Sequence, residues 1–443
     1  MILNIAFPET NIWLIHIMSS LCRKPKLYHS LYNILFIANV VSHSYRYKRL
    51  LEKIRQQNIK PENRLLTGPK IWNIAVIDNI DFMERTYAYS NIFDAIHTLL
   101  FLYEKTFQNF LNIYANNNWD ADDILKNIAQ QIELGCDILP PNVVILQPGD
   151  NPNSNTNIHN ACDLYFDDVK VDNTGCLDIT CDEAIFCRLI LYKENNNKII
   201  RPLLGQWHTS RDMCIVLINI FSGYGIANMA WILPITSQCL AAKLGVRFLD
   251  KLEKVVDYSA TCRVLELIWI AVGIAIFKYI KSKNQTLNDI KNSSNSIIKV
   301  WYYYFCWAGY WIGHKIGIRR GNYEMQIKNL KAFFPLFPVA GKVNYARSVT
   351  YFLTYVKNDP HLQELLRHVC SINLTNSGHY FAFDEALERF GIKYIKQNIG
   401  GKTMDLKELK IQISSVQAER ERLDLLISEF ISDTVVIRNE KAI

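Results

Sequence analysis

The stretch IWNIAVIDNIDF, residues 71–82, decides how the rest of the chain is interpreted, because it is an apolar run that ends in acid. The four apolar residues 74–77 lead directly into Asp78, and Asp81 follows three residues later. A short apolar run bounded by polar residues is typical of a strand buried inside a sheet. The sequence therefore predicts a β-strand that delivers carboxylates to the edge of a sheet.

Further strand candidates alternate with helix candidates as far as residue 225. The strand candidates are the apolar runs 142–146, 176–181 and 199–208. The helices that follow the last two runs are opened by Asp182 with Glu183 and by Ser210, which is the expected N-cap of the second helix. This alternation predicts an α/β layer with mostly parallel strands.

Beyond residue 225 the strand signal fades, and long apolar and aromatic stretches at helical spacing replace it. The chain is therefore predicted to be helix-rich overall, an α/β core with a large α-helical part. The predicted regions are an N-terminal helical region (1–70), the α/β core (71–225), a helical region with a returning acidic helix (226–400) and a C-terminal amphipathic helix (401–443).

The composition is that of an ordinary globular protein, with 49% hydrophobic and 21% charged residues in a chain of 443. The net charge of +7 is spread along the chain, so it is compatible with nucleic acid as a partner without arguing for it. The eleven cysteines include no CxxC pair, which excludes a zinc ribbon or finger, and a chain of this size needs no disulfide framework. We therefore expect an intracellular protein.

Two apolar segments raise the question of a membrane. Residues 1–22 lack the basic start of a signal peptide, so none is expected. Residues 264–280 are apolar over about one membrane thickness, for which roughly 20 residues are needed. They form either a membrane span or a helix buried on all sides. We expect the buried helix, because a lone span in the middle of a compact, aromatic-rich chain is hard to place.

Carboxylates recur where predicted strands end, and again on a late helix. Asp78 and Asp150 each follow a strand candidate, and the helix FDEALERFGIKYIK carries Asp384 and Glu388. The carboxyl ends of adjacent parallel strands meet in one crevice, and carboxylate oxygens are the ligands of Mg²⁺. This order of acids is that of ribonuclease-H-like nucleases and transposases, in which two metal ions serve phosphodiester chemistry. It predicts a ribonuclease-H-like mixed sheet with a long helical insertion, although each acid taken alone is also a common turn residue.

Two further motifs hold candidate site residues. LLGQWHTSRDM places His208 at the end of a predicted strand, either as a metal ligand or base or as a structural histidine bonded to the backbone. GHKIGIRRGNYEM carries Lys315, Arg319 and Arg320 among aromatic residues. Such a mixture holds nucleic acid by phosphate contacts and stacking, and a solvated basic turn between helices is the alternative interpretation.

Several blocks, among them LGQWHTSRDM, WAGYWIGHKIGIRRGNYEM and GHYFAFDEALERFGIKYIKQNI, resemble a large multicopy family of uncharacterised fungal proteins that is expanded in mycorrhizal fungi. The resemblance extends over most of residues 20–430, and its C-terminal part is similar to a domain of unknown function associated with transposable elements. The recurring positions of that domain would here be Gly149 with Asp150, His208, residues 344–346, and Asp384 with Glu388.

The leading hypothesis is a transposase-derived protein with metal-dependent phosphodiester chemistry on nucleic acid, DNA being the expected partner and the nucleus a compartment that fits. The residues expected to catalyse are Asp78, Asp150, His208 and Glu388, and those expected to hold Mg²⁺ are Asp78, Asp150, Asp384 and Glu388. One alternative is a domesticated or decayed relative that binds nucleic acid or protein without cutting, which the unexpectedly long segment 226–244 favours. The other is a single-span membrane protein through residues 264–280.

Overall fold

The computed structural model describes residues 71–78, 154–169, 176–195, 199–226, 258–373 and 380–392, and the single residues Ile37, Leu65, Val144, Leu146 and Ile413. The chain forms two compact units, each assembled from segments that are distant in the sequence. The first unit comprises residues 1–73, 142–175 and 387–443, and the second comprises residues 74–141 and 176–386. The three described strands belong to the second unit.

These strands form a parallel sheet in the order β1 (Ile74–Ile77), β2 (Cys176–Cys181) and β3 (Ile199–Leu204). Ala75 is opposite Ile179, and Ile179 is opposite Pro202, which fixes the register across the sheet. Every residue of β2 after Cys176 and of β3 after Ile199 is buried. Burial of successive residues, which point to opposite faces, is typical of a parallel sheet that is covered on both sides.

The helix α8 (Glu183–Asn195) makes the crossover that the parallel pair of β2 and β3 requires. Asp182 caps its N-terminus, because Oδ1 of this residue accepts a hydrogen bond from the N–H of Ile185 at 2.8 Å. The apolar side of α8 includes Phe186 and Leu189, which are fully buried, and the helix contacts both strands. The helix α18 (Val343–Asn358) packs against α8 and β3 in turn.

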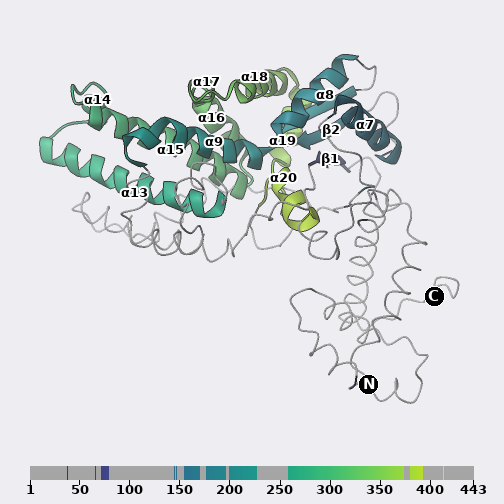
Figure 1. The fold of residues 1–443 in the computed structure, drawn as a ribbon, viewed down its shortest axis with the longest axis horizontal. Coiled ribbons are helices and arrows are strands. Elements are labelled where there is room, and N and C mark those ends of the chain that lie inside the picture. The colour runs from purple at the N-terminus through teal and green to yellow at the C-terminus, as the bar shows by residue number, and fades with distance from the viewer. Residues whose placement is uncertain are drawn as a thin grey trace. The chain divides into compact units, whose positions relative to one another are not determined.

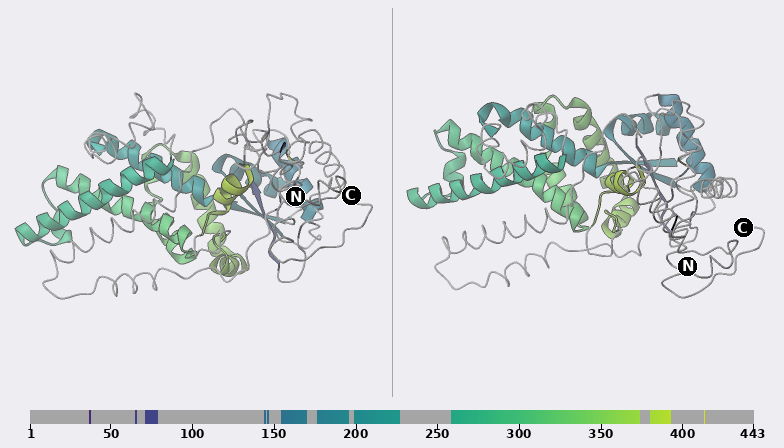
Figure 2. Two further views of the ribbon diagram at one scale, coloured as in Figure 1. Left: turned by 90° about the horizontal axis from the view of Figure 1, so that it is seen from below. Right: turned by 60° about the horizontal axis from the view of Figure 1, so that its bottom comes forward.

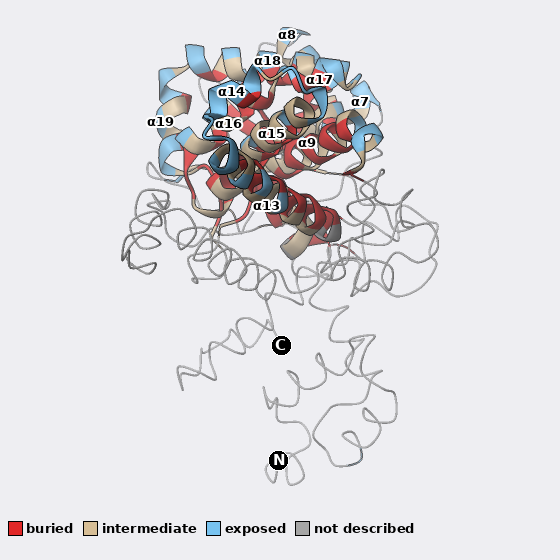
Figure 3. Ribbon diagram, turned by 90° about the vertical axis from the view of Figure 1, so that its left-hand side faces the viewer, coloured by how far each residue is buried: buried red, intermediate tan, exposed pale blue. Residues whose placement is uncertain are grey.

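Beyond β3 the described residues of the second unit are mostly helical, and three long helices pack together there. The helices α9 (Gln206–Phe221), α13 (Tyr258–Lys283) and α15 (Ser296–Arg319) contact one another in all three pairs. Figure 3 shows α9 largely buried, and α13 and α15 with buried and intermediate residues alternating along them. Figure 1 shows α13, α14 and α15 extending away from the strands. The other elements are η2 (Ser222–Tyr224), α14 (Leu287–Lys291), α16 (Tyr323–Phe333), α17 (Leu336–Val339), α19 (Pro360–His368) and α20 (Phe383–Ala386).

The helix α13 contains the segment 264–280 that the sequence presents as either a span or a buried helix. Its residues Val264, Leu265 and Ile268 are buried, and the helix contacts α9 and α15. Its course beside α15 can be followed in both views of Figure 2. None of the helices in the described part of the chain, α13 included, is long and apolar enough to cross a membrane.

The described part of the first unit consists of two helical elements. The helix α7 (Asn155–Val169) buries Ile158, Cys162 and Phe166, which are spaced four residues apart and therefore share one side of the helix. The π-helical turn η4 (Leu387–Ile392) carries Glu388. Both elements are helical over their described residues.

The predicted combination of an α/β layer with a large helical part is confirmed. The strand predicted at residues 176–181 has these bounds in the structure, and the run at 199–208 forms a strand only as far as Leu204. The three described strands are all parallel, so the mixed sheet of a ribonuclease-H-like fold stays a prediction. Single residues apart, the predicted strand 142–146, the regions 1–70 and 401–443 and the segment 226–244 lie outside the described residues.

Candidate functional site

The carboxyl edge of the sheet gathers polar residues from all three described strands. Asp78 follows β1, Asp182 follows β2, and Gly205 and Gln206 follow β3 at the start of α9. The short helix α20 contacts β1, β2 and α9, and it brings Asp384 to this edge. Ligand sites of parallel α/β sheets form at this edge, because the loops and helix N-termini that follow the strands converge there.

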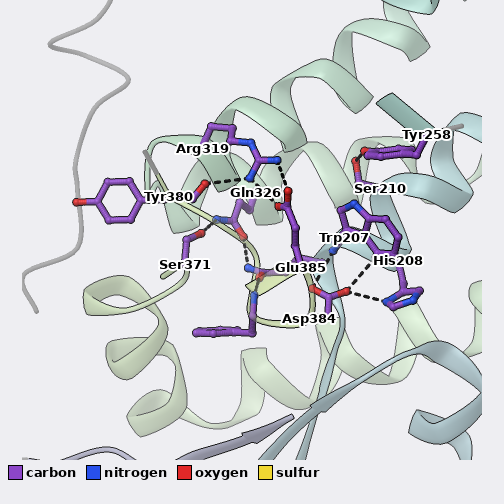
Figure 4. A network of polar contacts seen from close by, with 12 residues as sticks. Trp207, His208, Ser210, Tyr258, Arg319, Gln326, Ser371, Tyr380, Asp384 and Glu385 are labelled. Atoms are coloured by element: carbon purple, nitrogen blue, oxygen red, sulfur yellow. Dashed lines mark hydrogen bonds and ion pairs between the residues drawn. The ribbon is translucent and has the colours of Figure 1, made fainter. Parts of the chain in front are cut away.

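The N-terminus of α9 is capped by a carboxylate from a distant part of the chain. The N-cap residue Gly205 has no side chain to offer, and Asp384, which is 177 residues beyond Trp207, supplies the acceptor. Oδ1 of Asp384 accepts a hydrogen bond from the N–H of Trp207 at 3.1 Å, and Oδ2 accepts one from the N–H of His208 at 3.0 Å (Figure 4). The carboxylate therefore satisfies two free donors of the helix and lies at the positive end of its dipole.

Glycine at position 205 is what allows this close approach. A Cβ atom there would lie 2.5 Å from Oδ2 of Asp384 and 2.8 Å from the carbonyl oxygen of Cys181. Both distances are too short for any side chain, and one of the two neighbours is rigid backbone. The position thus requires glycine because of the distant carboxylate, and not because of its own backbone conformation.

The prediction that Ser210 caps this helix is wrong. The helix begins at Gln206, so Ser210 lies in its second turn, where it is buried and its Oγ is 2.9 Å from the hydroxyl oxygen of Tyr258. Local sequence favoured serine as the cap because the true acceptor comes from another segment of the chain.

His208 combines a fixed orientation with a strongly altered pKa. Its Nδ1 is 3.0 Å from Oδ2 of Asp384, and its side chain is 15% exposed. Burial alone lowers the pKa of an imidazole, but the hydrogen bond to Asp384 and the negative charges of Asp78, Asp384 and Asp182 outweigh burial and raise the pKa to about 9. His208 is consequently protonated at neutral pH. Its Nδ1 is hydrogen-bonded to Asp384, and its other protonated nitrogen is Nε2.

The charge of Asp384 is stabilised by the same contacts. Burial raises the pKa of a carboxyl group, but the hydrogen bonds from His208 and from the backbone N–H of Trp207, with the charge of His208, hold this pKa below its usual range. The pair is therefore a buried imidazolium and carboxylate. Such a carboxylate fixes the ring of a histidine and stabilises its charged form.

A network of amide side chains connects this edge to the helical part. Nε2 of Gln206 donates to Oε1 of Gln326 and to the carbonyl oxygen of Cys370, each at 2.6 Å. The N–H of Phe383 donates to Oε1 of Gln206 at 3.3 Å, which ties the start of α20 to the start of α9. Gln326 donates further to the hydroxyl of Ser371 at 3.2 Å (Figure 4). Asp384 is thus held in place from several directions.

Two of the three basic residues predicted to bind nucleic acid form ion pairs with buried carboxylates. Arg319 forms a two-bonded ion pair with Glu385, with both N–O distances at 2.6 Å, and also donates to the carbonyl oxygen of Tyr380. Lys315 pairs with Glu266 at 2.5 Å across α13 and α15. Each of these two cations is paired with a buried carboxylate, so the phosphate-binding face at Lys315 and Arg319 stays a prediction. Arg320 is half-buried just after α15.

The structure brings together some of the predicted catalytic residues. Asp78, His208 and Asp384 meet at the carboxyl edge of the sheet, where the charge of Asp78 acts on the imidazole of His208. Asp150 lies outside the described residues, and Glu388 belongs to the first unit. The charges of Asp78 and Asp384 thus both act on His208, and the sharing of a metal ion by these acids stays a prediction.

The described residues do not by themselves provide the predicted magnesium site. Among residues 71–78, 154–169, 176–195, 199–226, 258–373 and 380–392, no group of three or more His, Cys, Asp or Glu side chains is arranged to hold a metal ion. Asp384 already accepts three hydrogen bonds, and the carboxylate of Glu385 is taken up by Arg319. Asp78 and Asp182 are the other carboxylates that follow strands at this edge, and Oδ1 of Asp182 accepts the hydrogen bond that caps α8.

Sequence reasoning missed three features of this site. Asp182 was assigned only to the start of α8, although its charge also reaches His208. The requirement for glycine at 205 and the pairing of Glu385 with Arg319 both depend on segments far apart in the chain. The signal that could have found Asp182 is its position directly after a buried strand, which is the same signal that singled out Asp78.

Comparison with known proteins identifies no relative of this chain. No family model, no curated protein and no solved structure matches the chain. The resemblance to a fungal family and to transposon-derived proteins therefore stays a prediction, and the class of protein rests on the α/β architecture and on the carboxyl-edge site alone.

Proposed function

We propose that this chain is a transposase-derived protein that carries out phosphodiester chemistry on nucleic acid, with His208 as its acid–base group. The observation that carries this proposal is the pair of His208 and Asp384, with Nδ1 and Oδ2 3.0 Å apart at the carboxyl edge of a parallel sheet. Phosphodiester cleavage requires a proton donor for the leaving oxygen and an acceptor for the attacking water or hydroxyl. A histidine whose ring is fixed through Nδ1 presents Nε2 for one of these roles.

The pKa of about 9 selects the role of acid for His208. At neutral pH the ring is an imidazolium, which donates a proton to the leaving oxygen and attracts the phosphate charge before it does so. The neighbouring carboxylate of Asp384 keeps the ring charged until the proton leaves. Asp78 and Asp182 supply carboxylates on the other two strand ends, where an attacking water can be deprotonated.

Magnesium stays part of the proposal through Asp78 and Asp384, the two predicted ligands that lie at this edge. When bound, the metal ion supplies a Lewis acid for the phosphate and for the attacking water. Of the other predicted ligands, Asp150 lies outside the described residues and Glu388 belongs to the first unit. The role of His208 therefore rests on its own contacts.

A second candidate is a protein that binds nucleic acid without cutting it. This candidate is favoured by the saturation of the acidic residues on α20: Asp384 accepts three hydrogen bonds, and Glu385 is paired with Arg319 at two atoms. Buried carboxylates whose two oxygens both accept hydrogen bonds from the protein are typical of structural networks. The two candidates differ in whether purified protein breaks a phosphodiester bond.

The test is nicking of supercoiled plasmid DNA by the purified full-length protein with Mg²⁺ or Mn²⁺, and with EDTA as a separate arm. We expect the wild type to nick the plasmid and the His208→Ala variant to lose activity by about 10²–10⁴-fold, the contribution usual for a general acid. The Asp78→Ala variant is expected to lose activity in the same assay.

The matched control is His368→Ala, which removes an exposed histidine that contacts Glu364 on its own helix. We expect this variant to cut like the wild type. If the wild type does not nick DNA with either metal present, the cutting proposal fails and the binding candidate takes its place. Equal activity of the wild type and of His208→Ala would remove the acid–base role from His208.

A further inference from the structure

A lysine-rich tip stands at the far end of the helical part, away from the strands (Figure 1). We call this segment, residues 278–303, the α13–α15 tip; it comprises the end of α13, the short helix α14 and the start of α15. It contains five lysines and one acidic residue, so its net charge is +4. The lysines are Lys278, Lys281, Lys283, Lys291 and Lys299. The tip therefore carries a local excess of positive charge.

The single acid of the tip is occupied by the tip itself. Oδ2 of Asp289 accepts hydrogen bonds from the N–H of Thr286 at 2.7 Å and from the hydroxyl of Thr286 at 2.8 Å. Together with the bond from the N–H of Asp289 to Thr286, these form a capping box at the start of α14. The capping box fixes the turn between α13 and α15, and the aspartate faces its own backbone rather than the lysines.

The lysines are presented to solvent on a rigid framework. Lys278, Lys281, Lys283 and Lys291 are exposed, and Lys299 is half-buried. Lys278 and Lys281 lie three residues apart on α13 and therefore share one side of that helix. The next turn of α15 adds Trp301 and Tyr302, which are half-buried, and Tyr303, which is 41% exposed. Basic and aromatic residues interleaved in this way suit phosphate contacts and stacking on bases.

The tip contrasts with the basic residues that the sequence singled out. Lys315 and Arg319 lie further along α15, where each is paired with a buried carboxylate. Lys278, Lys283 and Lys291 of the tip are exposed, so their ammonium groups can reach a polyanion in solution.

We propose that the α13–α15 tip binds the phosphate backbone of duplex DNA without reading its sequence. The choice of DNA as the polyanion rests on the proposed function. An anionic membrane is the other polyanion to consider, but surface-bound helices need a broad apolar face. At the tip only Leu287, at 41%, and Ile297, at 68%, are large exposed aliphatic side chains among the described residues.

The experiment measures binding of a labelled DNA duplex by fluorescence anisotropy, with full-length protein, EDTA and a series of salt concentrations. The variant Lys278→Ala/Lys281→Ala/Lys283→Ala removes three charges of the tip. Each lost phosphate contact lowers the slope of log affinity against log salt by about 0.9, so we expect the slope to fall by about 2–3 and affinity to drop at least about tenfold. Circular dichroism shows that the variant is folded.

The matched control is Lys328→Ala/Lys331→Ala/Lys357→Ala, which removes the same charge from exposed positions on α16 and α18. We expect its affinity to stay within about twofold of the wild type, since distant surface charges are screened at physiological salt. Equal weakening in both triple variants would show a general effect of net charge and would overturn the proposal, as would unchanged binding in the tip variant. Binding of phosphatidylserine vesicles that depends on the tip, with no binding of the duplex, would assign the surface to membranes instead.

Failure of this proposal and failure of the proposed function are distinguishable. Binding is measured in EDTA and also with His208→Ala, so it does not depend on cleavage. If the protein nicks DNA and the tip variant binds DNA as tightly as the wild type, only the tip proposal is contradicted. If DNA binding depends on the tip lysines and the protein does not nick DNA, only the cutting proposal is contradicted.

Discussion

Burial and neighbouring charges have opposite effects on the pKa of His208. Burial lowers its pKa, and the contacts to carboxylates raise the pKa to about 9. Replacing Asp384 by Asn keeps the size of the side chain and removes the charge. We expect the pKa of His208 in the Asp384→Asn variant to fall below about 7, because burial then acts with fewer opposing charges.

The measurement is an NMR titration of the histidine ring signals, with His208 assigned from the spectrum of His208→Gln. A pKa that remains near 9 without the charge of Asp384 would assign the effect to Asp78 and Asp182 instead. The two outcomes show whether Asp384 or the other charges, Asp78 and Asp182, raise the pKa of His208.

Gly205 offers a second test at the scale of one residue. A Cβ at this position meets the carboxylate of Asp384 at 2.5 Å and the carbonyl oxygen of Cys181 at 2.8 Å. We expect Gly205→Ala to lower the free energy of unfolding by about 1–3 kcal/mol, the usual cost of overpacking. Gly223→Ala is the matched control, because no atom lies within 4 Å of its added Cβ. Urea denaturation measures both, and equal effects would contradict the close approach of Asp384.

At the scale of elements, the ion pair between Arg319 and Glu385 fastens α20 to the end of α15. The side chains are 18% and 2% exposed, so removal of one partner leaves a charge in a poorly solvated place. We expect Arg319→Met and Glu385→Met each to lower the free energy of unfolding by about 3–5 kcal/mol. The double variant is expected to lose much less than the sum, because it leaves no unpaired charge.

The control for this cycle is Arg367→Met, which removes an arginine that is 49% exposed and pairs with Glu324 and Glu364. Because solvent screens an exposed ion pair, this variant should be nearly as stable as the wild type. Additive losses in the Arg319 and Glu385 double variant would show that the two side chains do not act as a pair.

The elements that sequence could predict are those whose signal is local. The strand at 176–181 and the helix opened by Asp182 follow from an apolar run and a capping residue next to each other. The start of α9 could not be predicted in this way. Its cap comes from Asp384, so the residues around Ser210 indicated a plausible but incorrect N-terminus.

The same distinction explains the partial success for the site. Asp78 and His208 are recognisable because each follows an apolar run, and parallel strands bring such positions together. Whether Arg319 meets solvent or a carboxylate depends on a segment 66 residues away, and no spacing rule encodes that contact. The sequence therefore indicated which residues lie at the edge of the sheet. The partner of each charged side chain could be identified only from the folded structure.

At the scale of the whole molecule, two buried histidines respond to pH in opposite senses. The pKa of His208 is raised from 6.5 to about 9. The pKa of His314 on α15 is lowered from 6.5 to about 4 by burial, and its Nδ1 has no hydrogen-bond partner in the described part of the chain. One histidine favours the folded state when it is charged, and the other favours it when it is neutral.

These shifts predict a maximum of stability near pH 6.5. Between about pH 6.5 and 9 the folded state holds a proton on His208 that the unfolded state has released, so stability falls as pH rises. Between about pH 6.5 and 4 the unfolded state protonates His314 while the folded state does not, so stability falls as pH falls. Each difference in pKa corresponds to about 3 kcal/mol at most.

The test is urea denaturation of the full-length protein from about pH 5 to about pH 9.5, comparing the wild type with two single variants. We expect His208→Gln to be nearly insensitive to the rise from about pH 6.5 to 9, because it has no proton to lose. His314→Gln should likewise resist the fall from about pH 6.5 to 5. Since each variant removes one limb of the profile and leaves the other, a change in both limbs by one substitution would mean that the two histidines do not titrate independently. A wild-type profile that rises steadily with pH would contradict the imidazolium of His208, and with it the acid role that the proposed function assigns to this residue.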